Sequence, residues 1–467
     1  MRPALPAYRL WLAALAVVIA GWGLWPAAAR AGMISMCHRA PVFSGAAVNV
    51  VILPYQFDSI GNFSGNRRSG DHLGFLIQMD TLLGLLKYRS IGVVKLLDPE
   101  SREGCDPRKI LERILTRGPS SESLREGQGL ILLWGRFFAE GDNLYVQSYL
   151  QFLRKGRREE WSLPWPGGPS GSRLRGALPN TVISFAPRQL TRQDLKALDR
   201  DFQALTRAYE KPSRNSPKKE LNLYDHFGFY VTDARKGWMK IAPFGWPEGG
   251  GWIEARTDSA RFPLRKKLPE LNLVDALTGY LERRIRSASD QPRQPRLAEW
   301  VRKALRQFKE DSPRTPPAPA HALAELLTAF TYLNPDGPPP EPFPEEAHRA
   351  LHRAVRWAPD LADLHNLAVM GDLARDFHKG TPATRRLEKH RQTLTRILSL
   401  APDNPYILGN LQTLSERLLD RGEGPETAQL RQALKVISRI RSQPPAHPPA
   451  LPSLLWEAPP LRKTGER

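Results

Sequence analysis

The chain has 467 residues and a formal net charge of +20, from 68 Lys plus Arg against 48 Asp plus Glu. With 41% hydrophobic residues it can form about two to four domains with real cores, which excludes a wholly disordered chain, while 43 prolines imply many breaks. The positive charge favours anionic partners such as nucleic acid, lipid head groups or acidic polymers.

Residues 1–31 have the three parts of a secretory signal peptide. Arg2 and Arg9 precede an apolar run that extends from Leu10 to Leu24, and Ala29-Arg30-Ala31 supplies small residues for cleavage. A retained membrane anchor is the alternative, although the apolar run is short for a membrane span. We therefore expect a periplasmic protein, with outer-membrane association or secretion as further destinations and without a nucleic-acid partner.

Cys37 and Cys105 are the two cysteines of the chain. In an oxidising compartment, an isolated pair without metal-ligand companions indicates one disulfide, which would tie the mature amino terminus to a helix predicted at residues 106–116. Two free thiols are the alternative. Lipidation of Cys37 is disfavoured, because Met36 is a poor residue before a lipidated cysteine.

Residues 42–155 predict a small α/β sandwich. Runs typical of buried strands alternate with helix-period segments, in the order βαβαβ, at residues 48–53, 71–86, 91–97, 106–116 and 129–135. The first strand is expected to stop at Pro54-Tyr55. The turn Glu140-Gly141-Asp142-Asn143 then leads into a strand whose apolar residues alternate from Leu144 to Phe152, which predicts a hairpin at the end of the domain.

This unit resembles the TolB-like amino-terminal domain, which is related to the CsgG and FlgO type of envelope α/β domain. The resemblance rests on Val51-Ile52-Leu53-Pro54-Tyr55, on Asn62-Phe63-Ser64-Gly65, and on Gly135 followed by Gly141-Asp142 and apolar alternation to Leu150. It implies a domain that works in envelope assemblies. Such domains are also found joined to tetratricopeptide repeats.

The region after the sandwich is predicted to be a connector followed by one helix. Residues 156–190 are expected to be a linker, and their glycine-rich part lacks the Gly-Lys-Ser or Gly-Lys-Thr of a phosphate-binding loop. Residues 191–210 predict an amphipathic helix that begins with a capping box of Thr191 and Asp194. The basic run at 211–219, rich in helix breakers, marks the expected domain boundary.

Residues 221–258 predict three short strands joined by glycine turns. Gly237-Trp238-Met239-Lys240-Ile241 and Gly251-Trp252-Ile253 resemble the second half of bacterial Src-homology-three-like barrels, which often bind cell-wall peptides. The first half of that pattern is not evident. Trp238 and Trp252 are therefore candidates for a ligand groove, and packing in the core of this unit is the alternative.

Residues 270–310 predict two basic helices, at 273–285 and 297–308. Five of their cations are candidates for contact with an anionic lipid or polymer surface. These are Arg283, Arg284, Arg302, Lys303 and Arg306. A solvated helix face is the alternative.

Residues 318–442 predict an array of helical repeats. Ala358-Pro359-Asp360 and Ala401-Pro402-Asp403 recur about 43 residues apart, and helices are expected after them at 361–377 and 406–419. These segments resemble tetratricopeptide units with an insertion at 379–386. A helix at 428–440 is expected to cap the array, and the proline-rich tail at 443–467 to be extended or disordered.

Patterns that carry catalysis or bind metal are sparse. His348 and His352 are four residues apart on a predicted helix, but Arg349 and Arg353 lie beside them in the sequence and no third ligand is indicated. The sequence has no nucleophile elbow, His-Glu-x-x-His pair or Cys-x-x-Cys pair. We therefore expect no catalytic residue, no cofactor and no metal.

Together these patterns predict a multidomain α/β plus α protein, with a small sandwich, a short barrel-like β segment and a carboxyl-terminal helical array. The expected function is that of an exported, non-enzymatic binding or scaffold protein of the bacterial cell envelope. Its expected partners are envelope proteins, bound through the repeats and the TolB-like domain, with peptidoglycan or an anionic lipid surface as a further contact. The alternative is an envelope hydrolase for cell-wall or glycan substrates, with Trp238 and Trp252 as its substrate platform.

Overall fold

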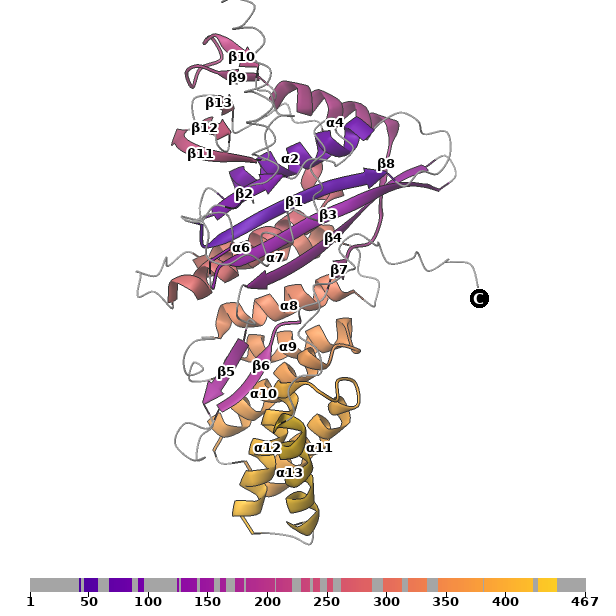
Figure 1. Ribbon diagram of the computed structural model, residues 1–467, viewed down its shortest axis with the longest axis vertical. Coiled ribbons are helices and arrows are strands. Elements are labelled where there is room, and N and C mark those ends of the chain that lie inside the picture. Colours follow the sequence, from indigo (N-terminus) through magenta and orange to yellow (C-terminus); the bar gives the residue numbers. More distant parts are fainter. Residues whose placement is uncertain are drawn as a thin grey trace, which may run out of the picture.

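A computed structural model of the chain describes residues 42, 46–57, 67–85, 91–95, 124–125, 127–140, 143–154, 160–164, 173–179, 182–205, 207–220, 228–235, 238–243, 250–254, 262–287, 297–312, 318–333, 343–380, 382–422 and 427–442. In this part of the chain, eleven helices accompany an 11-stranded sheet and a two-stranded sheet. Neither sheet closes into a barrel. The large sheet lies at one end of an elongated molecule, and a stack of helices extends from it (Figure 1).

The centre of the large sheet is the predicted βαβ unit. Strand β1 (Val48–Phe57) pairs in parallel with β2 (Ile91–Lys95) and with β3 (Gly129–Glu140), and β3 forms an antiparallel hairpin with β4 (Asn143–Arg154). Helices α2 (Arg67–Leu85) and α6 (Glu270–Ser287) pack against this strand and contact each other. Val48 and Val50–Leu53, whose side chains alternate between the two faces of the sheet, are all fully buried. The continuous apolar run of β1 therefore reflects burial on both faces of the sheet.

Strand β1 is longer than predicted, because it continues past Pro54 to Phe57. Its register against β3 shifts between Ile52 and Tyr55, which is where a proline without an N–H group interrupts the ladder. After the shift, Tyr55 lies opposite Gly135 on β3.

The expected barrel-like segment is instead an extension of the same sheet. Its strands follow β2 in the spatial order β11, β12, β13, β9, β10. They are β9 (Arg207–Tyr209), β10 (Lys218–Glu220), β11 (Gly228–Arg235), β12 (Trp238–Pro243) and β13 (Gly251–Glu254). The junction is a pairing of β11 with β2, through Phe229 opposite Val93. The expected boundary at 211–219 falls in the β9–β10 hairpin, so the prediction of a separate β domain there is wrong.

The expected linker at 156–190 is also wrong, because it contains four strands. Strands β7 (Ile183–Ser184) and β8 (Arg188–Leu190) pair with β4, whereas β5 (Glu160–Pro164) and β6 (Arg173–Ala177) form a separate hairpin. The alternation of buried Trp161 and Leu163 with half-buried neighbours is the strand signal that the prolines and glycines of this region obscured.

Helix α4 (Arg192–Leu205) begins at the predicted capping box. The backbone N–H of Asp194 donates to Oγ1 of Thr191 at 3.1 Å, and the N–H of Thr191 donates to Oδ2 of Asp194 at 2.8 Å. The helix ends before the predicted residue 210, and Tyr209 lies on β9 instead.

The remaining helices follow one another from the sheet to the far end of the molecule (Figure 1). They are α5 (Leu264–Lys267), α6, α7 (Leu297–Asp311), α8 (Pro319–Tyr332), α9 (Glu345–Trp357), α10 (Ala362–His378), α11 (Thr384–Leu398), α12 (Pro405–Asp420) and α13 (Thr427–Ser442). From α7 onward each helix packs on the next one along the chain. The helices predicted at 273–285, 297–308, 361–377, 406–419 and 428–440 are confirmed, and the insertion at 379–386 leads into α11.

Several predictions concern residues outside the described part of the chain. These are the signal peptide at 1–31, the pair Cys37 and Cys105, the helix at 106–116 and the tail at 443–467. Within the described residues, no helix combines the length and the apolar character needed to cross a bilayer.

Candidate functional site

The β5–β6 hairpin leaves the large sheet and lies against helices α10 and α12 (Figure 1). Its apolar side chains Trp161, Leu163 and Leu174 are at most 2% exposed. The Trp161 ring meets Phe330 of α8 edge-on, with 6.0 Å between the ring centroids. A segment of the amino-terminal half is therefore buried against the carboxyl-terminal helices.

The backbone of Arg175 on β6 is held by the side chain of Asn410 on α12. The N–H of Arg175 donates to Oδ1 of Asn410 at 2.8 Å, and Nδ2 of Asn410 donates to the carbonyl oxygen of Arg175 at 2.7 Å. A carboxamide carries both a donor and an acceptor, so it pairs with this residue as a neighbouring strand would.

A second asparagine completes this contact. Nδ2 of Asn366 on α10 donates to the same Arg175 carbonyl at 3.0 Å, and its Oδ1 accepts from Nδ2 of Asn410 at 2.8 Å. Asn366 is 0% exposed and Asn410 2% exposed. Each is followed by a leucine, and each stands shortly after one of the two Ala-Pro-Asp segments. Two buried carboxamides, one from α10 and one from α12, thus meet at the carbonyl group of Arg175.

Gly176 lets the strand come close to α10. A Cβ atom at this position would lie 2.6 Å from Cδ2 of Leu367, which is shorter than real contacts allow, and 3.0 Å from Sδ of Met370, which is a tight contact. By contrast, the side chain of Arg175 is exposed. The helices therefore contact the backbone of β6 and the buried side of the hairpin, and leave the Arg175 side chain in solvent. We call this contact, formed by Asn366, Leu367, Met370 and Asn410, the hairpin groove.

Two further hydrogen bonds fix the start of the hairpin at Glu160. The hydroxyl of Tyr406 on α12 donates to Oε1 of Glu160 at 2.5 Å, and Nη2 of Arg284 on α6 donates to the Glu160 carbonyl at 2.7 Å. Residues from α6 and α12 thus meet at one residue of β5.

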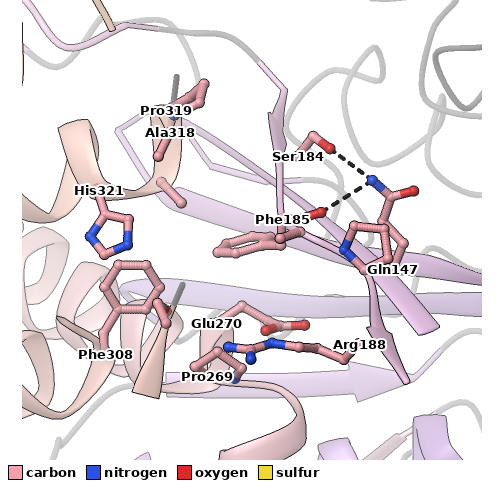
Figure 2. Close-up of a pocket in the computed structure, with 14 residues that line it drawn as sticks. Gln147, Ser184, Phe185, Arg188, Pro269, Glu270, Phe308, Ala318, Pro319 and His321 are labelled. Atoms are coloured by element: carbon pink, nitrogen blue, oxygen red, sulfur yellow. Dashed lines mark hydrogen bonds between the residues drawn. The ribbon is translucent and has the colours of Figure 1, made fainter. Parts of the chain in front are cut away.

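A pocket of about 310 Å³ lies where the sheet meets α6, α7 and α8. Figure 2 shows its lining: Gln147, Ser184–Arg188, Pro269, Glu270, Phe308, Ser312 and Ala318–His321. Nε2 of Gln147 donates to Ser184 Oγ and to the Phe185 carbonyl, both at 3.1 Å. His321 stacks on Trp357, with 4.7 Å between ring centroids. The walls are mainly apolar and carry a few fixed polar groups, as small-molecule sites do.

Glu270, the first residue of α6, is a pocket-lining residue whose pKa is strongly shifted by burial. It is 2% exposed, and burial raises its pKa to about 7, opposed by a hydrogen bond from Ser148 and by the charge of Arg188. Ser148 Oγ is 3.0 Å from the Tyr55 hydroxyl, so the carboxyl group ends a buried chain of polar groups. Burial, and next the charge of Glu270, raises the pKa of Tyr55 far above its usual value, and the phenol stays protonated.

Arg188 is the cation that faces Glu270 in Figure 2. Its Nη2 donates to the Asp311 carbonyl at 2.6 Å, which fixes the guanidinium at the end of α7. The pocket therefore offers a carboxyl group that titrates near neutral pH, a fixed guanidinium and an imidazole. Among the described residues that line it, Glu270 is the only carboxylate.

The two predicted groove tryptophans lie on the outer β strands. Strand pairing puts Trp238 opposite Glu254 and Trp252 opposite Lys240, so the two indoles share one face of the sheet, diagonally placed. Trp252 is 5% exposed with the Arg235 guanidinium 5.1 Å from its ring, and Trp238 meets Tyr209 edge-on at 5.1 Å. Their side chains are thus engaged within the sheet, although they share a face as a groove would require.

The five predicted surface cations differ in how far they are exposed. Arg284 is 8% exposed and hydrogen-bonded to Glu160, so its assignment to a surface contact is wrong. Arg283 and Arg302 are half-buried, with the Arg302 guanidinium 5.4 Å from the Tyr332 ring. Lys303 and Arg306 are exposed, as an anionic contact requires.

His348 and His352 do have a third group within reach, which the sequence did not indicate. Asp372 of α10 lies between them, at 2.7 Å and 2.9 Å from their Nε2 atoms. Asn366, Asn410 and Glu270 were likewise not among the residues predicted for a site. For the asparagines, the available signal was the Asn-Leu pair that follows both Ala-Pro-Asp segments.

Comparison of the chain with protein-family models, with curated proteins and with solved structures finds no match. The contacts of the hairpin groove, the pocket and the sequence resemblances are the observations that bear on function.

Proposed function

We propose that this protein is a non-enzymatic binding or scaffold protein of the bacterial cell envelope, and that its carboxyl-terminal helices bind an extended polypeptide segment. The observation that carries the proposal is the double hydrogen bond between Asn410 and the backbone of Arg175. The chain's own β5–β6 hairpin is the occupant of this groove, and a partner segment would take the same place.

The contacts of the hairpin suggest which segments would fit. Asn366 and Asn410 bind the carbonyl oxygen of Arg175, and Asn410 also accepts from its N–H, which proline alone would lack. The two asparagines therefore select an extended backbone rather than a side chain. Leu174 is fully buried, and Gly176 lies where any side chain would strike Leu367. A partner strand with an apolar residue, then any residue, then glycine satisfies these contacts. This mode of binding adds main-chain hydrogen bonds to one side-chain pocket, as strand addition does at a sheet edge.

The hairpin limits how strongly a partner can bind. A ligand tethered in the same chain acts at an effective concentration of roughly millimolar order, so a partner must compete with it or bind after its release. Occupancy by the chain's own hairpin would also protect the buried amides of Asn366 and Asn410 from being left unpaired. Binding to a partner is thus expected to be an exchange of one strand for another.

The finer architecture is part of the proposal. The order of β1, α2 and β2, with β3 parallel to β1, supports a TolB-like sandwich at the centre of the large sheet. The packing of successive helices from α8 to α13, with a buried asparagine in each of α10 and α12, supports tetratricopeptide-like repeats. In the families that these units resemble, both serve protein contacts.

The cellular location is proposed from the sequence. The signal-like residues 1–31 support export to the periplasm, and the net charge of +20 supports contact with anionic envelope surfaces. Lys303 and Arg306 are the exposed members of the predicted basic set on α7. A separate contact of the TolB-like unit with envelope proteins, and a contact with peptidoglycan or lipid, remain part of the same proposal.

A peptide of residues 160–177 tests the proposal. In the intact protein the groove is occupied, so we expect weak binding of the labelled peptide in fluorescence anisotropy. A larger side chain at position 176 cannot fit against α10, so Gly176→Leu in the protein should release the hairpin from the groove. The affinity of the protein for the unmodified peptide should then increase at least about tenfold.

Adding Asn410→Ala to Gly176→Leu removes the groove amide and should abolish that gain. The matched control is Arg175→Ala in the protein, because the exposed side chain is replaced and the backbone contacts remain. Equal peptide binding by the Gly176→Leu protein with and without Asn410→Ala would refute a peptide-binding groove.

The runner-up function is an envelope hydrolase, and the observation in its favour is Glu270. A carboxyl group with a pKa of about 7 is suited to donate a proton near neutral pH. Glycoside hydrolysis, however, needs a second carboxylate across the scissile bond, and the described lining of the pocket has no other. Release of soluble fragments from purified cell wall by the wild type, lost in Glu270→Gln, would favour this enzyme instead.

A further inference from the structure

A cluster of two histidines and one aspartate joins helices α9 and α10. His348 and His352 are one turn apart on α9, so their imidazoles leave the helix on the same face. Oδ1 of Asp372 on α10 is 2.7 Å from Nε2 of His348 and 2.9 Å from Nε2 of His352. Two ring nitrogens from one helix and a carboxylate oxygen from the next therefore converge on one point.

We propose that His348, His352 and Asp372 bind a divalent transition-metal ion, with Zn²⁺ as the best fit. Imidazole nitrogen together with carboxylate oxygen is a ligand set that Zn²⁺ accepts, with three protein ligands and one open position. This site is independent of the hairpin groove and of its proposed function.

The geometry needs little change to hold the ion. The three ligand atoms lie within 4.8 Å of one another. At Zn–N and Zn–O distances of about 2.0–2.2 Å, tetrahedral ligands are about 3.3–3.5 Å apart. Each imidazole would therefore withdraw from Asp372 by about half an ångström, and the two imidazole nitrogens, which now lie at most 4.8 Å apart, would come to the same spacing.

The exposure of the three side chains leaves room for a fourth ligand. The side chain of His348 is 11% exposed, that of Asp372 is 26% exposed and that of His352 is 45% exposed. The cluster is thus anchored on the His348 side and open to solvent on the His352 side. Water can complete the coordination from that side.

Glu345 is placed to orient His348 when the metal binds. A histidine that ligates through Nε2 carries its proton on Nδ1, and it usually donates this proton to a carboxylate or carbonyl. Oε1 of Glu345 lies 3.8 Å from Nδ1 of His348. Glu345 would be a positioning residue of the site rather than a ligand.

Arg375 contacts the same ring nitrogen, Nδ1 of His348. Its Nη1 is 3.2 Å from Nδ1 of His348 and 3.7 Å from Oε2 of Glu345. Because arginine only donates, Nδ1 is the acceptor here and Nε2 carries the proton that points to Asp372. Metal binding would reverse this tautomer, and Arg375 would then pair with Glu345 alone.

Zinc titration of the full-length, chelator-treated protein tests the proposal by calorimetry and thermal unfolding. We expect one zinc ion per chain at this site, and a rise in Tm of about 5 °C when free zinc exceeds the Kd about 100-fold. His352→Ala should weaken zinc binding at least about tenfold and remove the rise in Tm. The matched control is His378→Ala, an exposed histidine of α10 outside the cluster, which should keep both.

A second variant keeps the test valid if His352→Ala lowers Tm in the presence of chelator. Glu345→Gln alters an exposed side chain, and should weaken zinc binding about 10-fold to 100-fold while all three ligands remain. The same zinc affinity and Tm rise in the wild type, His352→Ala and Glu345→Gln would overturn the proposal, as would a wild type whose Tm does not respond to zinc.

Discussion

Tyr55 shows how one side chain links strand pairing to the pocket. Its ring lies over Gly135 of β3, and its hydroxyl is 3.0 Å from Oγ of Ser148. Ser148 in turn reaches Glu270. A glycine singled out by the sequence pattern is thus the residue that makes room for a buried tyrosine.

Gly135→Ala should destabilise the protein by about 3 kcal/mol or more, because the new methyl group would overlap the Tyr55 ring and the Gln147 carbonyl. Urea unfolding measures the loss. Gly409→Ala is the matched control, since a Cβ at that helical glycine meets nothing within 4 Å and should stabilise α12 by up to about 1 kcal/mol. Equal stability of Gly135→Ala and wild type would contradict the packing described for Tyr55.

Glu270 should make stability fall as the pH rises. Its pKa is raised by burial from 4.5 to about 7 in the folded state, so folding favours the protonated form. The contribution of Glu270 to the free energy of unfolding is fully present below pH 4.5 and is lost as the pH rises through 7. The free energy of unfolding changes by about 3 kcal/mol over this range. Glu270→Gln keeps the shape without the charge, so its stability relative to wild type should rise by about that amount between pH 4 and pH 8.

Urea unfolding of the wild type and of Glu270→Gln at pH 4, 6 and 8 gives the difference in stability between them directly. A difference between Glu270→Gln and wild type that stays constant across these pH values would show that Glu270 ionises as easily in the folded protein as in the unfolded chain.

At the scale of elements, a partly buried cluster of charges joins three successive helices. Lys309 of α7 and Arg353 of α9 both pair with Glu325 of α8, each at 2.9 Å. Burial would raise the pKa of Glu325, but the hydrogen bond from Arg353 and the charge of Lys309 hold it below its usual value. The side chain of Glu325 is 8% exposed, so its loss would leave two cations facing a hydrophobic interface.

Glu325→Ala should therefore cost about 3 kcal/mol, the low end of the range for a broken buried ion pair, because Arg353 keeps 38% of its side chain exposed. The matched control is Glu346→Ala on α9. Its carboxylate is 57% exposed and 3.6 Å from Arg349, and its removal should cost at most about 1 kcal/mol. Similar urea midpoints for both variants would show that the charge cluster does not hold the helices together.

At the scale of the whole molecule, the amino-terminal and carboxyl-terminal halves are interlocked rather than linked in series. The hairpin between β4 and β7 packs among the helices, Arg284 of α6 holds Glu160, and Arg188 of β8 holds the end of α7. Separate expression of the two halves would remove the hairpin from its groove, so the functions of the protein have to be studied in the intact chain.

Much of the fold could be predicted from local sequence patterns. The parallel strands around Val48–Leu53, the capping box at Thr191 and the helices after each Ala-Pro-Asp segment follow from apolar periodicity and local hydrogen bonding. The partners of strands 207–254 could not be predicted, since β11 pairs with β2 through only two pairs of residues far apart in the sequence. Periodicity indicates a strand, but it does not indicate which strand lies beside it.

The hairpin groove could not be predicted for a related reason. Asn366 and Asn410 look like ordinary polar residues of amphipathic helices, and their role appears only when β6, about 190 and 235 residues earlier, lies between them. Similarly, Asp372 joins His348 and His352 only because α9 and α10 pack side by side. Local patterns indicate which residues are apolar, whereas these sites depend on long-range packing.

The affinity of the Gly176→Leu protein for a peptide methylated on the backbone nitrogen of Arg175 tests the central claim most directly. Methylation removes the N–H that donates to Asn410 and leaves every side chain in place. If the groove binds backbone, the methylated peptide of residues 160–177 should bind about tenfold or more weakly than the unmodified peptide, because the buried amide oxygen of Asn410 loses its donor. Replacement of the Arg175 side chain by alanine in the peptide should leave the affinity unchanged. Equal affinities of the methylated and unmodified peptides, or a loss confined to the alanine peptide, would contradict recognition of an extended backbone.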